Sequence, residues 1–435
     1  MGQTGHKNRR GQGPWLATLC VPVLIIAALS QPALAAPGSL DTSFDTDGIV
    51  ITPFNSFYNS SVSSVVTQSN GKIVAAGSTE TANGDAFALA RYMPNGALDT
   101  SFDYNGKVNT LIGYPYSGAR AVAIQSNGRI VAAGFAVIGS HTEFALARYM
   151  PNGELDTNFH GDGKVTTPFG SGARASSIAI QPNGKIVVAG EALIGGSYDF
   201  ALARYKVNGN LDSSFSGGKV NTPFGTHDAH AYSVAIQSDG KIVAAGDMFN
   251  GTYERFALAR YKSHGAPDNT FSGGKVMTSF GPRNASAASV AVQPNGKIVA
   301  AGRALNGSNN DLFAIARYKS HGAPDNTFSG GKVTTSINSY SDVTATAVAI
   351  QSNGRIVAAG QAFNGTHSEV AITRYKVNGI LDGTFGTGGK VTTSINNQDA
   401  SAKSVTLQSN DGKIVAAGQV YSGNNYEFVL TRYDV

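Results

Sequence analysis

The chain has 435 residues, of which 53 are glycine, 15 are proline and 14% are charged. This composition suits many short strands joined by tight turns, and it argues against a helical or a disordered protein. The formal net charge is +5 at pH 7, and part of that excess lies in the first residues of the chain.

Residues 1–35 have the pattern of a secretory signal peptide. A basic stretch with Lys7, Arg9 and Arg10 precedes a nearly continuous apolar run over residues 15–29, and small residues follow up to Ala35. The run is shorter than the roughly 20 residues that a membrane-spanning helix needs, although an uncleaved anchor is the alternative. We predict cleavage after Ala35 and a mature chain of residues 36–435, without a membrane span, that is secreted or periplasmic.

Removal of the signal changes two properties of the chain. Three of the 33 basic residues and no acidic residue are lost, which leaves 30 basic against 28 acidic residues and a net charge of +2. Such a balance gives no support for nucleic-acid binding or for an anionic membrane surface. The one cysteine, Cys20, also lies in the signal, so the mature domain must be stable without disulfides.

The mature chain consists of seven copies of a unit of about 57 residues. The motif GKIVAAG, with small variations, recurs at steps of 56 to 58 residues, which is the signature of a repeat architecture. It begins at Gly71, Gly128, Gly184, Gly240, Gly296, Gly354 and Gly412.

Each copy contains four short segments with strand character. In the copy around Gly184 they are residues 164–169, 177–181, 184–190 and 200–205, in that order. All four are rich in β-forming residues and lack the 3.6-residue period of a helix. Asn-Gly or Asp-Gly separates the second from the third segment, which predicts a tight hairpin and antiparallel pairing. The third segment is apolar on both faces and is expected to be buried between neighbouring units.

Seven recurring four-stranded units predict an all-β fold, a seven-bladed β-propeller whose ring is closed by the N- and C-terminal segments. An open solenoid is the rival architecture, but a solenoid needs caps on its first and last coils. The mature sequence instead opens on LDTSF at residues 40–44 and ends just after FVLTRY at residues 428–433. We interpret these two segments as complementary parts of one junction.

The junction has a fixed spacing that predicts how the ring closes. An arginine precedes an aspartate by eight residues in six copies, and Arg432 and Asp41 are left without a partner along the chain. We predict that Arg432 and Asp41 pair with each other. A phenylalanine follows each aspartate by three residues, as in a turn leading to a buried anchor. Because the set recurs identically in every copy, we assign it a structural role rather than a binding role.

With these motifs established, the sequence resembles the delta-60 repeat family, a group of bacterial β-propeller repeats of unassigned function. The matching text is FALARYxxNGxLDxSFxxxGKV together with AIQxNGKIVAAG, and it recurs through nearly the whole mature chain. Two copies depart from it, because Pro267 and Pro324 stand where leucine is usual. The resemblance implies a propeller and no established chemistry, so it assigns no catalytic residue.

Blade topology separates two kinds of loop. In an up-and-down blade alternate connections emerge on the same face, so the nearly invariant SNGK and NGxLDxSF turns share one face and the loops that differ share the other. Divergent loops on a rigid scaffold are a common recognition surface, and neutral divergence is the alternative. The tyrosines expected there to stack on sugars or to anchor a protein are Tyr58, Tyr116, Tyr232, Tyr253, Tyr340, Tyr421 and Tyr426.

Catalytic and metal-binding motifs are weak. The mature chain has no P-loop, HExxH or GxSxG motif and no cysteine nucleophile. His227, Asp228 and His230 form the one local group of metal-ligand types, and we predict neither a metal nor another cofactor. Acids from several blades could still meet near the axis without any linear motif.

We therefore expect an exported monomer that binds an extracellular glycan or a surface protein. One alternative is an extracellular hydrolase or lyase that acts on glycans at the central channel, and another is a structural spacer in a surface assembly. The residues near the axis distinguish these functions, because an enzyme should gather acidic and histidine side chains there. A binding protein should instead show an aromatic, uncharged rim.

Overall fold

The computed structural model describes Met1 and residues 35–55, 57–337 and 342–435. The predicted signal peptide and Tyr340 therefore lie outside the described residues. The chain divides into two units, Met1–Leu34 and Ala35–Val435, and the second unit is described below. Within the described residues, no helix has the length and apolar character to cross a membrane.

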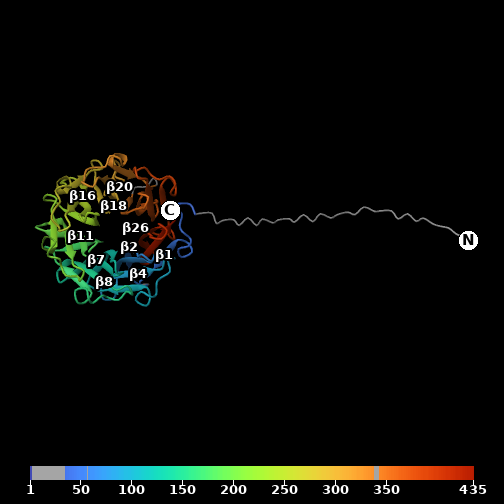
Figure 1. The fold of residues 1–435 in the computed structure, drawn as a ribbon, viewed down its shortest axis with the longest axis horizontal. Helices are drawn as coiled ribbons and strands as arrows, with labels where there is room; N and C mark the ends of the chain where they lie inside the picture. Colours follow the sequence, from blue (N-terminus) through green and yellow to red (C-terminus); the bar gives the residue numbers. More distant parts are fainter. Residues whose placement is uncertain (2–34, 56, 338–341) are drawn as a thin grey trace. The chain divides into compact units, whose positions relative to one another are not determined.

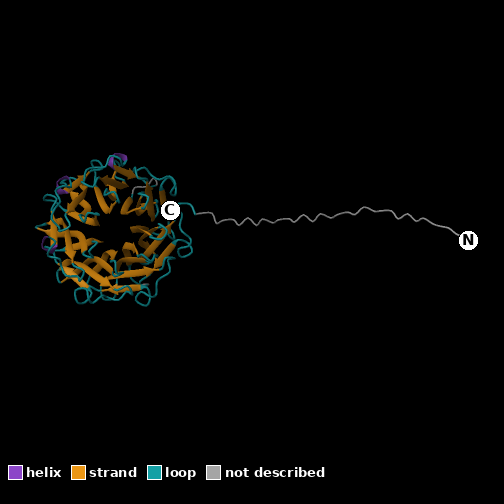
Figure 2. Ribbon diagram, in the orientation of Figure 1, coloured by secondary structure: helices purple, strands orange, loops and turns teal. Residues whose placement is uncertain are grey.

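The second unit is a ring of seven four-stranded antiparallel sheets (Figure 1, Figure 2). This arrangement confirms the predicted seven-bladed β-propeller. We number the blades along the chain: blades 1 to 6 hold β2–β5, β6–β9, β10–β13, β14–β17, β18–β21 and β22–β25, and blade 7 holds β26–β28 with β1. The inner strands of neighbouring blades contact one another all around the ring, and Figure 1 shows β2, β18 and β26 near its axis.

The strands of equivalent position are closely similar in length. The inner strands are β2 (Ser60–Thr67), β6 (Ser117–Ile124), β10 (Ala173–Ile180), β14 (Ala229–Ile236), β18 (Ala285–Val292), β22 (Val343–Ile350) and β26 (Ala400–Leu407). The second strands are β3 (Ile73–Thr79), β7 (Ile130–Ile138), β11 (Ile186–Ile194), β15 (Ile242–Phe249), β19 (Ile298–Leu305), β23 (Ile356–Phe363) and β27 (Ile414–Tyr421).

The outer half of each blade follows the same pattern. The third strands are β4 (Ala86–Tyr92), β8 (His141–Tyr149), β12 (Ser197–Tyr205), β16 (Glu254–Tyr261), β20 (Asp311–Tyr318), β24 (Ser368–Tyr375) and β28 (Tyr426–Tyr433). The outer strands are β1 (Ile49–Thr52), β5 (Lys107–Thr110), β9 (Lys164–Thr167), β13 (Lys219–Thr222), β17 (Lys275–Thr278), β21 (Lys332–Thr335) and β25 (Lys390–Thr393). Short 3₁₀ turns precede three of them: η1 (Ser216–Gly218), η2 (Ser272–Gly274) and η3 (Ser329–Gly331).

The structure corrects the grouping of strands into blades. The segment at residues 164–169 was expected to begin its own blade, but β9 is the outer strand of blade 2 and pairs with β8. The reason is local, because the LDxSF turn returns the chain directly onto the preceding strand, whereas a variable loop leads from β9 to β10. A repeat is periodic, so its spacing does not show where a blade begins. The predicted antiparallel pairing across the Asn-Gly turn is confirmed by β10 and β11.

The second strand is buried in every blade, as expected from its small apolar residues. In β11 the side chains of Ile186, Val187, Val188 and Ala189 have no exposed surface. The glycine that follows, Gly190, lies opposite the inner strand, and a Cβ there would stand 1.9 Å from the carbonyl oxygen of Arg174. The last glycine of the GKIVAAG motif is therefore required by close approach of two backbones.

The ring closes through blade 7, which combines both ends of the second unit (Figure 1). Strand β1 pairs antiparallel with β28, with Ile49 opposite Thr431. One guanidinium nitrogen of Arg432 lies 2.6 Å from a carboxylate oxygen of Asp41. These are the two residues that the eight-residue spacing leaves without a partner along the chain.

The recurring arginine joins neighbouring blades. In blade 3 the Nε of Arg204 donates to Asp212 at 2.8 Å, and its guanidinium lies 4.7 Å from the ring centroid of Phe215. The same guanidinium donates to the carbonyl of Ser263 in blade 4. Lys185, from the SNGK type of turn, forms a second ion pair with Asp212 at 2.8 Å. Because these contacts recur around the ring, the arginine and aspartate set accounts for blade cohesion.

A tyrosine forms a second link between blades. The hydroxyl of Tyr149 in blade 2 donates to the hydroxyl of Thr110 in blade 1 at 2.9 Å, and both side chains are buried. Equivalent hydrogen bonds join the other blades, including Tyr92 to Thr52 on β1. Burial raises the pKa of Tyr149, so the phenol stays neutral.

Candidate functional site

The two faces of the ring differ in the loops that they carry. The turns between first and second strands and the loops between third and outer strands lie on one face. The connections between second and third strands and those between blades lie on the other, which we call the variable-loop face. This division agrees with the sequence prediction. Assigning the outer strand to the preceding blade changes the blade boundaries, but each connection stays on the face that was predicted for it.

Each inner strand carries a β-bulge close to the variable-loop face. In β10 the register shifts between Ala175 and Ser177, so Ser176 has no partner on β11, and the same shift occurs in all seven blades. A bulge redirects the side chain that it carries. The seven bulges therefore each add to the inner strand one side chain outside the regular pairing register.

We define the axial rim as three equivalent positions in each blade. The bulge residues are Ser63, Arg120, Ser176, Tyr232, Ala288, Thr346 and Lys403. The residues two positions earlier are Ser61, Gly118, Arg174, His230, Ser286, Thr344 and Ser401. Their partners on the second strands are Ser78, Phe135, Glu191, Asp247, Arg303, Gln361 and Gln419.

The chemistry of the rim changes around the ring. Blades 2 to 5 contribute arginine, glutamate, histidine, tyrosine, phenylalanine and aspartate, whereas blades 6, 7 and 1 contribute serine, threonine and glutamine, with Lys403 as the exception. The scaffold evidently folds with small neutral residues at these positions. The ionisable groups in blades 2 to 5 are therefore not required by the fold.

His230 lies at the centre of the charged part of the rim. Its Nδ1 is 3.0 Å from Asp247, and its Nε2 is 3.9 Å from Glu191 of blade 3. Asp247 also accepts a hydrogen bond from the hydroxyl of Ser286 at 2.7 Å. Burial alone would lower the pKa of His230, but the hydrogen bond to Asp247 and the charges of Asp247 and Glu191 raise it above its ordinary value. The imidazole is thus held between two carboxylates and favours its protonated form.

Two tyrosines enclose this histidine. The ring of Tyr232 is nearly parallel to the imidazole, with centroids 6.0 Å apart, and the ring of Tyr198 lies at 5.3 Å. Burial and the negative charges of Asp247 and Glu191 raise the pKa of Tyr232. The Tyr232 phenol therefore keeps its proton at neutral pH and is a hydrogen-bond donor.

Arginines flank the cluster on both sides. Arg120 and Arg174 each place the guanidinium 5.4 Å from the ring centroid of Phe135, and no ion pair joins either of them to a carboxylate in the described part of the chain. On the other side Arg303 lies 3.5 Å from Glu254. Burial raises the pKa of Glu254, and the charge of Asp247 adds to the effect. Arg120 and Arg174 are therefore two rim guanidinium groups outside ion-pair range of any described carboxylate.

The tyrosines expected in variable loops lie in several settings. Tyr232 is part of the cluster, but it stands on the inner strand β14 rather than in a loop. Tyr421 and Tyr426 also lie in strands, at the ends of β27 and β28, and their rings are 5.4 Å apart. The other three described tyrosines of the set, which lie in connections between strands, are Tyr58, Tyr116 and Tyr253.

The structure gives His227, Asp228 and His230 separate partners. Asp228 accepts the backbone N–H of Tyr198 at 2.8 Å, and His227 packs edge-on against Phe249 at 5.6 Å. His230 instead faces Asp247. Across residues 35–55, 57–337 and 342–435, no three His, Cys, Asp or Glu side chains are placed to hold a metal ion.

The sequence interpretation missed most of the rim. Arg174 and Glu191 fall in the connections that flank the predicted segments 177–181 and 184–190, and only tyrosines were selected as binding residues from such connections. In the structure β10 and β11 extend through both residues. A signal was nevertheless present, because alignment of the seven GKIVAAG motifs shows a different residue directly after the last glycine in nearly every copy. This column is the second-strand position of the rim.

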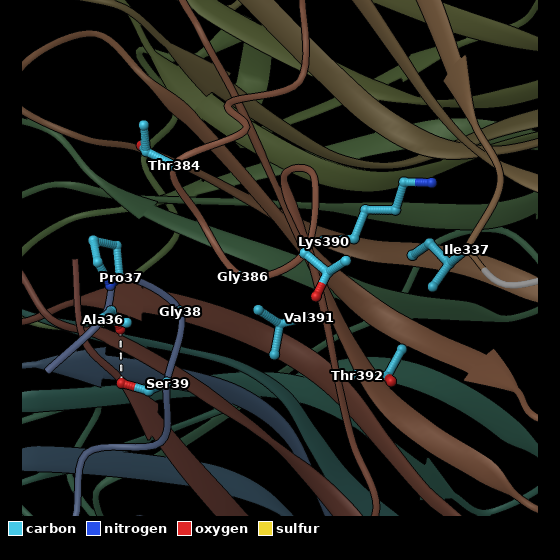
Figure 3. A pocket seen from close by; sticks show the side chains of 11 residues that line it. Ala36, Pro37, Gly38, Ser39, Ile337, Thr384, Gly386, Lys390, Val391 and Thr392 are labelled. Carbon is cyan, nitrogen blue, oxygen red and sulfur yellow. Dashed lines mark hydrogen bonds between the residues drawn. The ribbon is translucent and has the colours of Figure 1, made fainter.

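A large cavity of about 650 Å³ lies elsewhere, where the segment with Pro37 meets β25 (Figure 3). The amide of Gly386 donates to the carbonyl of Pro37 at 2.8 Å. Lys390 is the one ionisable residue in its lining, which otherwise consists of small, hydroxyl and aliphatic residues such as Ile337 and Thr392. This cavity belongs to the ring closure and has no cluster of reactive groups.

Six segments of the chain match a family model described as "Domain of unknown function (DUF5122) beta-propeller". They are residues 68–102, 125–159, 181–215, 237–271, 293–328 and 351–385. Each runs from the first turn of a blade to the phenylalanine that follows the junction aspartate. The equivalent part of blade 7 is divided between the two ends of the second unit. The chain therefore carries β-propeller repeats of this kind.

Solved structures with a similar fold include an ulvan lyase from a new family of polysaccharide lyases, with 12% identity, a TM-score of 0.49 and coverage of 92% of this chain and 94% of that one. Chaetomium thermophilum Sqt1 has 11% identity and a TM-score of 0.43, with coverage of 89% of this chain and 100% of that one. The periplasmic gluconolactonase of Pseudomonas aeruginosa has 13% identity and a TM-score of 0.43, with coverage of 75% of this chain and 86% of that one. No curated protein matches the sequence. Similarities at this level carry no functional argument.

Proposed function

We propose that this chain, a propeller with six recognisable family repeats, is an exported protein that binds an acidic glycan at the axial rim. The observation that carries the proposal is the concentration of ionisable and aromatic side chains at rim positions of blades 2 to 5, where other blades have serine, threonine or glutamine. Repeated scaffold positions that diverge together at one place are the expected mark of a ligand site.

The lining of the rim favours a glycan over a protein partner. Protein interfaces have an apolar core with a polar edge, whereas Phe135 is the one large apolar side chain of the rim. Hydroxyl, amide, guanidinium and carboxylate groups provide the donors and acceptors that sugar hydroxyls require. The rings of Tyr198 and Tyr232 supply flat surfaces against which a sugar ring can pack.

The charges of the rim favour a ligand with negative groups. Arg120 and Arg174 stand side by side around Phe135 without a carboxylate in ion-pair range among the described residues. A guanidinium matches the planar geometry of a carboxylate and can bind it with two hydrogen bonds. A uronic acid or a sulfated sugar would supply the missing anion.

The binding experiment compares acidic with neutral oligosaccharides. Isothermal titration of the mature protein should show saturable binding of an acidic oligosaccharide, and Arg174→Gln should weaken it about 10-fold to 100-fold, because a hydrogen bond to a charged group contributes about 1.5–3 kcal/mol. Lys206→Gln, which removes an exposed cation from the opposite face, is the control and should bind normally. Equal affinities for the two variants would refute the assignment of the site.

Acid–base catalysis on the same glycan is the second candidate function, and His230 favours it. The sequence interpretation expected an enzyme to gather acidic and histidine side chains near the axis, and this candidate is supported by the group of Glu191, His230 and Asp247 on the first two strands of blades 3 and 4. Tyr232 keeps a proton that it could donate to a leaving oxygen. The same groups could instead only bind the sugar, so turnover has to be measured.

The experiment for catalysis follows chain shortening of acidic polysaccharides by size-exclusion chromatography and by new reducing ends. Tyr232→Phe keeps the aromatic surface and removes the proton. If the protein is an enzyme, the wild type should shorten the polysaccharide. Tyr232→Phe should shorten it much more slowly and should bind it with the affinity of the wild type. Wild-type protein that binds the polysaccharide and leaves its length unchanged would exclude the catalytic function for that substrate.

Export is the remaining part of the proposal and has its own measurement. Mass spectrometry of the protein recovered from its native cells should give a chain that begins at Ala36, in the periplasm or outside the cell. Cytoplasmic protein that retains residues 1–35 would refute this part.

A further inference from the structure

The uncharged part of the rim contains one exception, which is Lys403. It occupies the bulge position of blade 7, where the neighbouring blades 6 and 1 have Thr346 and Ser63. A cavity of about 210 Å³ lies beside it, and its volume suits one sugar unit or one charged group rather than a larger ligand. The lining consists of Gln361, Ser368, Asp399, Ala400, Ser401, Lys403, Gln419 and Tyr426.

Within the described residues no carboxylate lies in ion-pair range of the Lys403 ammonium group. Among the described residues no ion pair or hydrogen bond joins it to another group, and burial lowers its pKa. Asp399 also lines the cavity, but it accepts the backbone N–H of Ser368 at 2.8 Å. By contrast Lys413, in the same blade, pairs with Asp41 at 2.6 Å. A partly buried cation without a partner is costly, and the fold does not need one here because Thr346 and Ser63 serve at the same position.

The remaining lining supplies further hydrogen-bond donors. The side-chain oxygen of Gln419 accepts the hydroxyl of Ser61 at 2.6 Å, which leaves its amide nitrogen as the group available to a ligand. The amide of Gln361 and the hydroxyl of Ser401 stand on neighbouring strands. The ring of Tyr426 packs against Tyr421 at 5.4 Å and forms a wall. Together with the Lys403 ammonium these amide and hydroxyl groups can bind an oxyanion, and the one carboxylate of the lining, Asp399, is held by the backbone N–H of Ser368.

We propose that the Lys403 cavity is a second binding subsite, which holds an anionic oxygen group of the ligand, either the carboxylate of a uronic acid or a sulfate ester. The ligand class rests on the proposed function, whereas the cavity and the unpaired cation stand independently of it. The subsite lies on the rim away from His230, so one extended acidic glycan could contact both parts of the rim.

The test uses the mature protein and the variant Lys403→Met, which keeps the length of the side chain and removes its charge. Two probes distinguish the sources of the anion: glucuronate for a carboxylate and glucose 6-sulfate for a sulfate ester, with glucose as the neutral reference. Each is titrated while the melting temperature is recorded. Lys206→Met, which removes an exposed cation from the opposite face, is the matched control.

We expect one of the two anionic sugars to raise the melting temperature of the wild type and of Lys206→Met, and to have at least 10-fold weaker affinity for Lys403→Met. Glucose should have no effect that depends on Lys403. The unliganded Lys403→Met protein should melt no lower than the wild type, because a desolvated charge has been removed.

The outcomes separate the two proposals. Equal affinity of an anionic sugar for wild type and Lys403→Met, or no shift with either sugar, would overturn the subsite. Binding of a longer acidic oligosaccharide that depends on Arg174 and not on Lys403 would keep the proposed function and remove the subsite. Monosaccharide binding that depends on Lys403, without binding of any oligosaccharide, would keep the subsite and remove the proposed function.

Discussion

Removal of the carboxylate charge at Asp41 should weaken the ring where the chain closes. In the wild type Asp41 lies 2.6 Å from both Arg432 and Lys413, and its side chain is 6% exposed. Burial would raise the pKa of Asp41, but hydrogen bonds from Lys413 and Ser43 and the charge of Arg432 lower it to about 2. The variant Asp41→Asn leaves the Arg432 guanidinium buried without its counterion.

The size of the effect follows from this environment. Breaking a buried ion pair from one side costs about 3–5 kcal/mol, and the lower end applies because Arg432 keeps hydrogen bonds to Gln408 at 3.0 Å and to Ser43 at 2.9 Å. Unfolding entropy is about 2.1 cal/mol/K per residue, or roughly 0.8 kcal/mol/K for a unit of about 400 residues. A loss of about 3 kcal/mol therefore lowers the melting temperature by about 4 °C.

Asp212→Asn is the matched control, because Asp212 has the same arginine, lysine and serine partners within blade 3. Calorimetry should show a similar decrease in melting temperature for both variants. Hydrogen exchange should separate them, since only Asp41→Asn should accelerate exchange of the β1 amides, Ile49 to Thr52. The reasoning would be refuted by a wild-type melting temperature for Asp41→Asn, or by β1 exchange that is equal in the two variants.

Three further changes test contacts within the blades and between them. Gly190→Ala places a Cβ 1.9 Å from the carbonyl oxygen of Arg174, so expression should yield little folded protein, and soluble yield with a wild-type circular dichroism spectrum would contradict the close approach. Tyr149→Phe leaves the buried hydroxyl of Thr110 without its donor, and urea denaturation should show a loss of about 1–2 kcal/mol. The pKa values of all seven junction aspartates are lowered in the folded state, so their stabilising contribution is complete above pH about 4 and is lost as the pH falls towards 2. Urea midpoints that are equal at pH 7 and pH 3 would contradict this.

Most of the fold could be predicted because the same signals occur seven times. One copy of GKIVAAG preceded by Asn-Gly suggests a hairpin, and seven copies at constant spacing suggest a ring. The partner of Asp41 could be inferred for the same reason, since six intact pairs define what the seventh lacks. The position of the outer strand was wrong because spacing shows the period of a repeat and not its starting point, and only the pairing of β9 with β8 resolves it.

The candidate site was harder to predict because its residues stand inside strands. The predicted segments 177–181 and 184–190 stop short of Arg174 and Glu191, whereas β10 and β11 extend through these residues and pair them with each other. The bulge was not visible either, because Ser176 and Tyr232 occupy the same position with unrelated side chains. Tyr232 was selected for its aromatic ring, and the residues that surround it, His230 and Asp247, come from the pairing of β14 with β15.

The location of the rim follows from how a propeller distributes its constraints. The arginine, aspartate and tyrosine contacts that join blades lie among the third and outer strands and the turns of the nearly invariant face, and the second strands are buried between blades. The inner strands have a free edge towards the axis, and each bulge adds one side chain whose type varies from blade to blade. Substitution there costs the fold little, as the range from Ala288 to Arg120 at one position shows. A ligand site can therefore develop at the rim by changing single residues in separate blades, and a site assembled in this way leaves no linear motif.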